Sequence, residues 1–248
     1  MTDSLIIIPT YHEEENIECL LREICSLDED FDILVIDDNS KDQTANIVKK
    51  LIQEYPNTIH LIERPGKLGL GTAYIAGFKW VLKKNYSYIF EMDADYSHSP
   101  KDLRPLLKAC KIEGIGMSVG SRYKKGVAIV NWPLGRLLLS YYASTYVRFI
   151  TGMSVRDLTA GFVCYRREVL EKLDLDKIRM IGYGFQIEMK FKVWKLGYSI
   201  CEVPVIFINR ELGTSKMSGG IFSEALLGVI HMKLSSLRKN YRKHIAKS

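Results

Sequence analysis

The stretch "YIFEMDADYSHSP", residues 88–100, decides the fold class of this chain. Its first residues are mostly apolar and predict a buried strand, which ends abruptly on Asp93 and Asp95. A helix pattern follows at 101–111, opened by a serine and a proline. Two carboxylates at the tip of a buried strand contribute nothing to a hydrophobic core. The stretch therefore predicts a strand–loop–helix unit whose loop carries a polar site.

The same alternation runs through the first half of the chain. Several expected strands are apolar nearly throughout, which is typical of strands covered on both faces. Their alternation with helices predicts an α/β fold, in which a mostly parallel central sheet with right-handed crossovers is flanked by helices. The expected strands are 4–9, 31–37, 58–63, 88–93 and 115–121, and the expected helices are 14–27, 42–54, 70–84 and 101–111.

After residue 122 the pattern changes. Pro204 lies inside a strand-like run and indicates an edge strand or a bulge. With no repeat or linker, the whole chain, 1–248, is expected to form one domain, with a core at about 5–218. The remaining residues, 219–248, are expected to form an amphipathic helix and a basic tail. The expected later elements are helices at 133–150, 184–196 and 220–237 and a strand region at 198–210.

Composition places few limits on function. The net charge of +6 favours anionic partners but does not select among them. The five cysteines are scattered without a CxxC pair, so we expect buried, reduced thiols and a cytosolic protein. No window of about 18 residues is free of charge, which argues against a membrane-spanning helix. The first residues do not have the pattern of a signal peptide.

Polar residues follow several of the expected strands. In an open α/β sheet, ligands bind beyond the carboxyl ends of the strands. The Asp-Asn-Ser run at 38–40 is also a common turn when taken alone. Because several strands end in this way, we expect a ligand site along this edge of the sheet. The residues that follow the expected strands are Pro9, Thr10, Tyr11, His12 and Glu13, then Asp37, Asp38, Asn39, Ser40, Asp42 and Thr44, then Asp93 and Asp95, and then Ser121, Arg122 and Tyr123.

The Asp-x-Asp pair of Asp93 and Asp95 is typical of a site for a hard divalent cation. Mg²⁺ takes one or two protein carboxylates and fills its remaining positions with water and phosphate oxygens, and Mn²⁺ suits the same ligands. No His/Cys cluster has zinc spacing, and there is no P-loop motif. The glycine-rich run 66–77 is a weak match to a dinucleotide fingerprint. The pair therefore predicts a Mg²⁺ or Mn²⁺ site for a substrate that carries a diphosphate.

Taken together, these motifs resemble the family 2 glycosyltransferases of the A-type fold, and most closely the dolichol- or polyprenol-phosphate mannose synthases. The likeness runs in order from about Leu5 to Ser218, which makes it far more specific than the Asp-x-Asp pair alone. The matching segments are "IIIPTYHEEENI" (6–17), "LVIDDNSKDQTANIV" (34–48), "RPGKLGLGTAYIAGF" (64–78), "EMDADYSHSP" (91–100), "GSRYKKG" (120–126), "NWPLGRLLLS" (131–140), "DLTAGFVCYRREVL" (157–170), "GYGFQIEM" (182–189) and "NRELGTSKMS" (209–218).

The resemblance implies roles for individual residues. Ser97 stands where several family members have a glutamine as third metal ligand, and since a hydroxyl is a poorer ligand, a water between Ser97 and the metal is the alternative. On the donor side it implies nucleotide contacts by Pro9, Tyr11, Glu13 and Asp38, metal and diphosphate binding by Asp93 and Asp95, and a loop with Arg210 and Lys216 that closes over the donor phosphates. On the acceptor side it implies lipid-phosphate binding by Arg122, Arg136 and Ser140.

The implied reaction is transfer of mannose from GDP-mannose to a polyprenyl or dolichyl monophosphate with inversion at the anomeric carbon. The acceptor oxygen is already anionic, so a strong general base is not required. Asp95, Arg122 and Arg210 are the implied catalytic residues. The alternatives are transfer of another sugar, such as glucose from UDP-glucose, or transfer to a glycan hydroxyl. A non-catalytic nucleotide-sugar binding subunit is disfavoured by the intact Asp-x-Asp pair, and nucleic-acid binding by the lack of an aromatic-interleaved basic patch.

The resemblance also implies contact with a membrane, where the lipid acceptor resides. The family has members with C-terminal transmembrane helices and members without them, and this chain resembles the second kind. The helix at 133–150, with Trp132 at its start, is suited to the headgroup interface, and the basic tail would add attraction to anionic lipid. Two alternatives remain open, a core role for this helix and a membrane-embedded partner subunit. We expect a cytoplasmic protein that is peripheral at the cytoplasmic face of a membrane.

Overall fold

The expected strands of the first half are all present in the computed structural model, which describes residues 2–180, 182–208 and 220–237. They form a seven-stranded sheet with the order β3-β2-β1-β4-β7-β5-β8. All neighbours are parallel except β7, which runs antiparallel to β4 and β5, so the prediction of a mostly parallel sheet is confirmed. The strands are β1 (Ser4–Thr10), β2 (Asp32–Asp37), β3 (Ile59–Glu63), β4 (Tyr88–Glu91), β5 (Ile115–Ser121), β7 (Val163–Arg166) and β8 (Ser199–Pro204).

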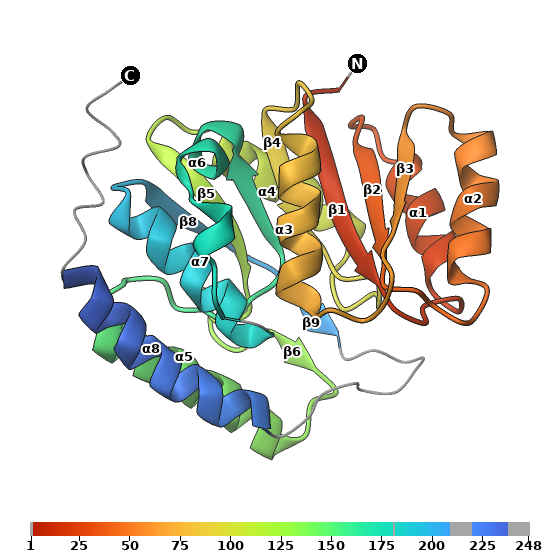
Figure 1. The fold of residues 1–248 in the computed structure, drawn as a ribbon. Helices are drawn as coiled ribbons and strands as arrows, with labels where there is room; N and C mark the ends of the chain where they lie inside the picture. Colours follow the sequence, from red (N-terminus) through yellow and green to blue (C-terminus); the bar gives the residue numbers. More distant parts are fainter. Residues whose placement is uncertain (1, 181, 209–219, 238–248) are drawn as a thin grey trace.

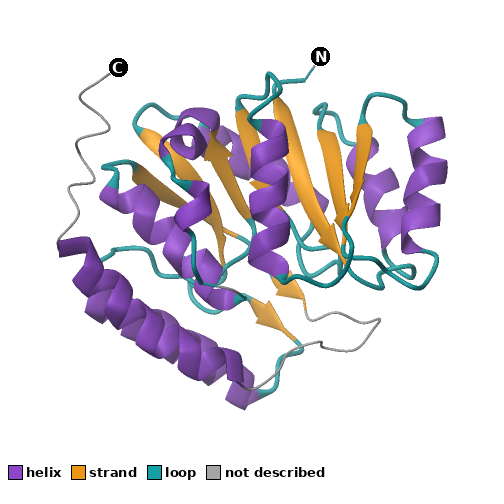
Figure 2. Ribbon diagram, viewed as in Figure 1, coloured by secondary structure: helices purple, strands orange, loops and turns teal. Residues whose placement is uncertain are grey.

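Helices cover both faces of the sheet (Figures 1 and 2). Helices α3, α6 and α7 pack on one face, and α1, α2 and α4 pack on the other. The helices are α1 (Ile17–Cys25), α2 (Thr44–Glu54), α3 (Leu70–Val81), α4 (Leu103–Cys110), α5 (Leu134–Thr151), α6 (Arg167–Lys172), α7 (Tyr183–Lys195) and α8 (Gly220–Leu237). This three-layer arrangement places the carboxyl ends of the parallel strands along one edge of the sheet.

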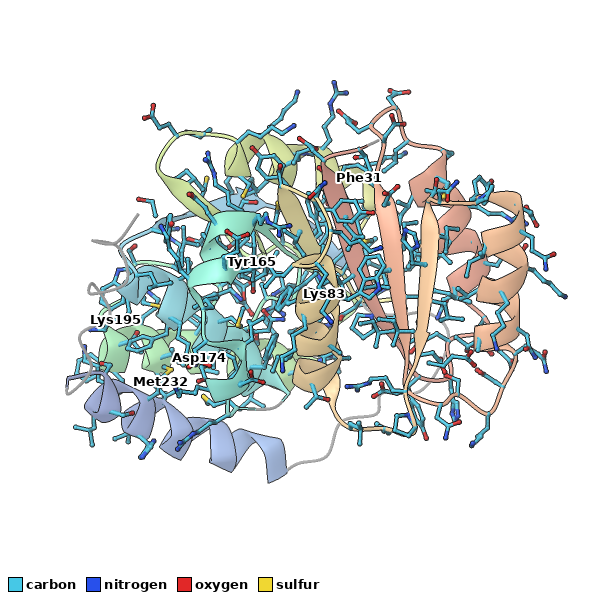
Figure 3. The ribbon with its side chains drawn as sticks, turned by 45° about the horizontal axis from the view of Figure 1, so that its top comes forward. Phe31, Lys83, Tyr165, Asp174, Lys195 and Met232 are labelled. Atoms are coloured by element: carbon cyan, nitrogen blue, oxygen red, sulfur yellow. The ribbon has the colours of Figure 1, made fainter. Side chains whose placement is uncertain are left out.

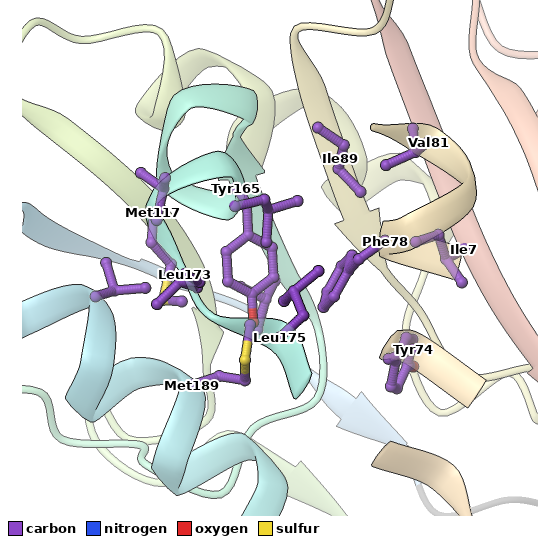
Figure 4. Close-up of a cluster of buried hydrophobic side chains, with 14 of the residues drawn as sticks. Ile7, Tyr74, Phe78, Val81, Ile89, Met117, Tyr165, Leu173, Leu175 and Met189 are labelled. Atoms are coloured by element: carbon purple, nitrogen blue, oxygen red, sulfur yellow. The ribbon is translucent and has the colours of Figure 1, made fainter. Parts of the chain in front are cut away.

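The two faces of the sheet divide the apolar residues by alternation. In β1, Leu5 and Ile7 belong to the core under α3, whereas Ile6 and Ile8 belong to the core under α1. Figure 4 shows the first of these clusters, in which Tyr165 of β7 lies beside side chains from α3 and α7. Polar and charged side chains such as Lys83 and Asp174 extend from the surface (Figure 3). Because both faces of the inner strands are buried, these strands are mostly apolar, whereas the edge strands β3 and β8 carry His60, Glu63 and Glu202.

The expected strand region 198–210 divides into two strands. Pro204 ends β8, which is the edge strand of the main sheet, as its lack of an N–H predicts. A second strand, β9 (Phe207–Ile208), then pairs with β6 (Ile129–Val130) in a separate two-stranded ribbon.

Helices α5 and α8 lie side by side beneath α7 (Figure 1). They share a small apolar cluster with α7 that is separate from the two cores of the sheet. Among the described residues, no helix is both long enough and apolar enough to cross a membrane.

The five cysteines are free, as expected, but they are not all buried. Cys110 and Cys164 are buried, Cys25 and Cys201 are half-buried, and Cys19 is exposed. Cys19 lies on the solvent side of α1, between the buried residues of its apolar face, so its place in a helical run did not predict its burial.

Candidate active site

The loops after β1 and β2 are joined by a buried carboxylate. Asp37 accepts hydrogen bonds from Thr10 Oγ1 at 3.0 Å and from Ser40 Oγ at 2.6 Å. The backbone N–H of His12 donates in turn to Ser40 Oγ at 2.9 Å. His12 and Asn39 both have positive φ angles, of 55° and 59°, which non-glycine residues seldom adopt. The two loops are therefore held in one fixed arrangement at the edge of the sheet.

The predicted nucleotide-binding residues of the first loop lie together beside this junction. Pro9, Tyr11 and Glu13 are all half-buried. The ring of Tyr11 lies under Lys67 Nζ, 4.6 Å from the ring centroid, and the backbone N–H of Glu13 donates to Thr44 Oγ1 at 2.9 Å. The cation of Lys67 comes from the loop that precedes α3, so a second loop reaches over the first.

Asp38 forms a buried ion pair. Its carboxylate accepts two hydrogen bonds from Arg64, at 2.6 Å from Nε and 2.7 Å from Nη2. The backbone N–H of Leu68 approaches the same carboxylate at 3.3 Å, and Arg64 Nη1 donates to Thr72 Oγ1 at 2.9 Å. Asp38 and Arg64 thus anchor the loop before α3 and the first turn of that helix.

The Asp-x-Asp pair lies just beyond β4. Asp93 is half-buried and its Oδ1 is 3.4 Å from the hydroxyl of Tyr74, while Asp95 is 9% exposed and its Oδ1 accepts from the backbone N–H of Ser97 at 3.1 Å. Between Asp95 and Ser97, Tyr96 has a positive φ of 57°. For a bulky aromatic residue this backbone conformation is strained, and such strain gathers at functional sites.

Two buried polar atoms next to the pair lack partners among the described residues. They are Ser97 Oγ and His98 Nδ1. The imidazole of His98 stacks on Phe162 at 4.7 Å and meets Phe207 edge-on at 5.1 Å. Burial, followed by the nearby Arg122 charge, lowers the pKa of His98 to about 4, so this ring is neutral near pH 7.

Arg122 forms the second buried ion pair of the site. Its Nε and Nη2 donate to the two oxygens of Asp157 at 2.7 and 2.6 Å, and its backbone N–H donates to the same carboxylate at 2.9 Å. Nη2 also reaches Thr159 Oγ1 at 2.8 Å. Burial alone would raise the pKa of Asp157, but the guanidinium outweighs it and holds that pKa below its ordinary value. These bonds hold the guanidinium plane in one orientation.

The three predicted acceptor residues come together in space. The guanidinium of Arg122 lies 5.4 Å from the ring centroid of Trp132, and that of Arg136 lies 4.2 Å from the same ring. Tyr123 donates a hydrogen bond from its hydroxyl to Ser140 Oγ at 2.8 Å. Residues from the loops after β5 and β6 and from α5 thus form one basic and aromatic cluster. We call it the acceptor cluster, and its members are Arg122, Tyr123, Trp132, Arg136 and Ser140.

A buried polar network lies behind Asp93. Glu91 accepts from Tyr165 at 2.9 Å and from Gln186 Nε2 at 2.5 Å. Lys190 donates from Nζ to the carbonyl oxygen of Ala160 at 2.6 Å and to Gln186 Oε1 at 3.3 Å. All these side chains are buried, and burial raises the pKa of Glu91 and lowers that of Lys190. The network fixes both the end of β4 and the start of α7.

Comparison with known sequences assigns the chain. The profile of the family described as "Glycosyl transferase family 2" matches residues 5–174. The chain belongs to glycosyl transferase family 2. It is 45% identical over 226 residues to the polyprenol monophosphomannose synthase of Mycolicibacterium smegmatis, covering 91% of this chain and 85% of that protein. It is 43% identical over 232 residues to the undecaprenyl-phosphate mannosyltransferase of Micrococcus luteus, covering 94% of each.

Solved structures agree on the fold of this family 2 glycosyltransferase. Glucosyl-3-phosphoglycerate synthase from Mycobacterium tuberculosis, in complex with phosphoglyceric acid, matches with a TM-score of 0.69 and 18% identity, over 94% of this chain and 80% of that one. Its complex with Mn²⁺, UDP-glucose and phosphoglyceric acid matches with a TM-score of 0.68 and the same identity, over 93% and 80%. The A-type fold predicted from the motifs is therefore confirmed.

The donor set of this glycosyltransferase fits a hard divalent cation that shares its ligands with a substrate. Among the described residues, no group of three or more His, Cys, Asp or Glu side chains is arranged to hold a metal ion. Asp93 and Asp95 are the carboxylates at the strand end, and Ser97 Oγ is the buried hydroxyl beside them. Mg²⁺ or Mn²⁺ bound by two carboxylates would complete its coordination with water and phosphate oxygens.

Many residues of this site were predicted from the sequence, and the structure adds three that were not. It brings Arg122, Arg136 and Ser140 together and places the Asp-x-Asp pair at the same end of the sheet as the first loop. Arg210 and Lys216 lie outside the residues that the structure describes. Sequence reasoning missed Arg64, Glu91 and Lys190. Glu91 had a signal, because a carboxylate inside an apolar strand requires a buried partner.

Proposed function

We propose that this enzyme transfers mannose from GDP-mannose to a polyprenyl monophosphate. The names of the two sequence relatives support the sugar and the lipid class. The observation that carries the proposal is the acceptor cluster, in which Arg122 and Arg136 flank Trp132. Arg122 also lies against Phe207, which packs on His98 in the loop after the carboxylate pair. Guanidinium groups suit a phosphate acceptor better than a neutral hydroxyl.

The donor would bind along the strand ends. Pro9, Tyr11, Glu13 and the Asp38–Arg64 pair would line the nucleotide pocket, and Asp93 and Asp95 would hold Mg²⁺ or Mn²⁺ with the diphosphate. A bound divalent cation supplies positive charge against the departing diphosphate. One structural neighbour is described in complex with Mn²⁺ and UDP-glucose, which supports the use of a divalent cation in this fold.

The reaction would be a single displacement. An anionic oxygen of the acceptor phosphate forms the new bond to the anomeric carbon, while the bond from that carbon to the diphosphate oxygen breaks and its electron pair leaves with GDP. Arg122 and Arg136 would align the acceptor phosphate, and the fixed orientation of Arg122 on Asp157 would reduce the cost of that alignment. No proton has to be removed from the nucleophile, which agrees with the engagement of Asp157 by Arg122.

Helix α5 would present the lipid acceptor at a membrane. Its inner face carries Arg136 and Ser140, whereas Leu134, Leu138 and Phe149 on the opposite face are 68%, 43% and 87% exposed. One helix thus joins the phosphate-binding residues to an exposed apolar stripe, which suits an amphipathic helix lying in the headgroup region. Further exposed apolar residues lie in and next to the β6–β9 ribbon: Val127, Val130, Ile206 and Ile208. We infer peripheral contact with the cytoplasmic face of a membrane.

The deciding experiment incubates the purified protein with labelled GDP-mannose, Mg²⁺ or Mn²⁺ and a polyprenyl monophosphate, and then extracts the lipid. We expect labelled lipid that requires both the metal and the phosphate headgroup of the acceptor. UDP-glucose and a polyprenol without phosphate serve as parallel substrates. Label in the lipid from UDP-glucose alone, or equal transfer to the free alcohol, would contradict the proposal. A membrane-embedded partner is indicated if transfer requires added membranes even with a detergent-dispersed acceptor.

A further inference from the structure

The exposed face of α5 carries a positive charge among its apolar residues. An α-helix turns by about 100° per residue, so exposed residues that lie within an arc of about 120° share one face. On α5 these are Leu134, Leu138, Tyr141, Tyr142, Thr145, Arg148 and Phe149. Arg148 is the charged member of this face, and it lies among leucine and aromatic side chains.

The chain segment around this helix contains no acidic residue. Residues 114–156 have six basic residues and no Asp or Glu, although the chain's average of 29 acidic residues in 248 would give about five in a segment of this length. Two of the basic residues belong to the acceptor cluster, Arg122 and Arg136, and the other four are exposed: Lys124, Lys125, Arg148 and Arg156. The exposed charges of this segment are therefore all positive.

Three of these cations lie together beside α5. Arg156 Nη1 donates to the carbonyl oxygen of Lys124 at 3.2 Å, which brings Arg156 next to the pair of Lys124 and Lys125. We call these three residues the basic patch. The ring of Tyr123, the residue before Lys124, meets the ring of Tyr141 edge-on at 5.7 Å. Since Tyr141 belongs to the exposed face of α5, and consecutive Cα atoms are about 3.8 Å apart, the basic patch adjoins that face.

The two carboxylates that bond to this region have partners inside the fold. Asp157, the residue after Arg156, is buried against Arg122. Glu202 is half-buried and accepts hydrogen bonds from Ser121 Oγ at 2.8 Å and from the backbone N–H of Asp157 at 3.0 Å. The basic patch is therefore exposed beside a positively charged apolar face, a combination that suits a surface of apolar chains and anionic headgroups.

We propose that α5 and the basic patch form a docking surface for a bilayer that contains anionic phospholipid. The apolar side chains of α5 enter the headgroup region, while the three patch residues and Arg148 lie at the level of the lipid phosphates. The inference rests on the proposed function for its purpose, because docking brings the acceptor cluster against the leaflet that holds the lipid phosphate. It deepens that function by naming the class of lipid that the surface selects and the residues that select it.

The first test measures co-sedimentation of the whole chain with vesicles. Vesicles of phosphatidylcholine alone are compared with vesicles in which about a third of the lipid is phosphatidylglycerol. We expect binding to the anionic vesicles to be at least about tenfold stronger at low salt, and this gain to disappear at about 0.5 M salt. Equal binding to both compositions would overturn the inference. Binding to native membranes with none to vesicles would assign the face to a membrane protein and would also overturn it.

The double variant Lys124→Gln/Lys125→Gln locates the charge. Each basic residue close to an anionic surface strengthens binding by about fivefold, so the variant should lose about tenfold or more on anionic vesicles and bind phosphatidylcholine like the wild type. Lys83→Gln/Lys84→Gln is the matched control, because these adjacent lysines after α3 are equally charged and exposed. We expect the control to bind like the wild type.

Two results with these variants would contradict the assignment. Equal losses in both double variants would show an effect of net charge alone. Undiminished selectivity for anionic vesicles in the Lys124→Gln/Lys125→Gln variant would place the selecting charge elsewhere, for example among the basic residues after position 237.

The second test connects docking to transfer. Polyprenyl phosphate is presented either in the anionic vesicles or in micelles of a non-ionic detergent. In vesicles, the Lys124→Gln/Lys125→Gln variant should require about tenfold more lipid phosphate for half-maximal transfer than the wild type. In micelles, which offer no anionic surface, it should match the wild type. An equal defect in both settings would assign the two lysines to the acceptor site itself and contradict a docking role.

The outcomes separate this inference from the proposed function. If the wild type transfers mannose in micelles but binds both kinds of vesicle equally, the proposed function stands and the docking surface is wrong. If the wild type binds anionic vesicles selectively through the basic patch but transfers no mannose, the docking surface stands and the proposed function fails.

Discussion

The proposed donor side and the proposed acceptor side of this site share one device and differ in another. Each contains a buried ion pair, Asp38–Arg64 on the donor side and Asp157–Arg122 on the acceptor side. On the donor side, loops from β1 and β2 are joined through Asp37, and Asp38 anchors a further loop through Arg64. On the acceptor side, α5 contributes Arg136 and Ser140 from a helix whose opposite face is exposed and apolar. Under the proposed function, the donor nucleotide would meet loops that are fixed before it binds. The proposed lipid phosphate would arrive on a membrane, where the exposed apolar face of α5 could meet the headgroups.

The largest expected effect is on the donor side. Asp95→Asn keeps an oxygen that can accept from the N–H of Ser97, so the fold should be retained. Loss of the carboxylate charge at the cation site should reduce mannosyl transfer by at least about 10³-fold. Steady-state transfer assays, with thermal unfolding in parallel, measure both quantities. Asp176→Asn, which alters an exposed carboxylate, is the matched control and should leave transfer unchanged. Near-normal transfer by the Asp95 variant would refute the cation site.

The next effect tests the ion pair that orients the acceptor arginine. Asp157→Asn leaves the buried Arg122 without its counter-charge and should lower the free energy of unfolding by about 3 kcal/mol. Glu171→Gln is the matched control, since its pair with Arg167 has the same 2.6 Å separation but is exposed. The control should cost less than about 0.5 kcal/mol. Denaturant unfolding of both variants measures the two losses in unfolding free energy. Equal losses would contradict the claim that burial makes the Arg122–Asp157 pair important for stability.

A smaller effect concerns the acid sensitivity of the region between the two sides. The pKa of His98 is lowered from 6.5 to about 4, so the unfolded chain takes up this proton first as the pH falls. The neutral ring therefore contributes stability above pH 6.5 that is lost as the pH falls toward 4, amounting to about 2 kcal/mol near pH 4.5. His98→Phe keeps the aromatic packing and removes the titration. Denaturant unfolding at each pH gives the free energy of unfolding, which should fall less between pH 6.5 and 4.5 in the variant than in the wild type. An equal fall in both proteins would contradict a lowered pKa of His98.

The smallest effect tests the exposed face of α5. Leu134→Ser should weaken binding to phospholipid vesicles by about tenfold, because a largely exposed leucine would no longer enter the interface. Ile112→Ser, at a similarly exposed apolar residue after α4, is the control and should bind like the wild type. Vesicle co-sedimentation measures both variants. Equal vesicle binding by the wild type and both variants would contradict contact between α5 and the membrane.

Local pattern predicted the elements that build the site, but not its long-range pairs. The apolar strands and the polar residues after them were readable because burial on both faces leaves few sequence options. The expected helix at 14–27 begins only at Ile17, because Glu14 bonds to Asp42 and Gln43 in the loop after β2. The partners of Asp38 and Asp157 are Arg64 and Arg122, and these pairs form only when loops distant in sequence pack together. The periodicity of apolar residues carries no information about such pairs. The resemblance to family 2 supplied Arg136 and Ser140, which spacing alone did not.

The division between a donor side and an acceptor side is the central claim, and Arg136→Ala tests it most directly. Arg136 lies in α5, is half-buried, and places its guanidinium over the ring of Trp132. The measurement is the KM for polyprenyl phosphate and the KM for GDP-mannose, each determined with the other substrate saturating. The KM for the lipid phosphate should rise by about tenfold or more, with the KM for GDP-mannose nearly unchanged. A similar rise in both values, or a rise for GDP-mannose alone, would contradict the account.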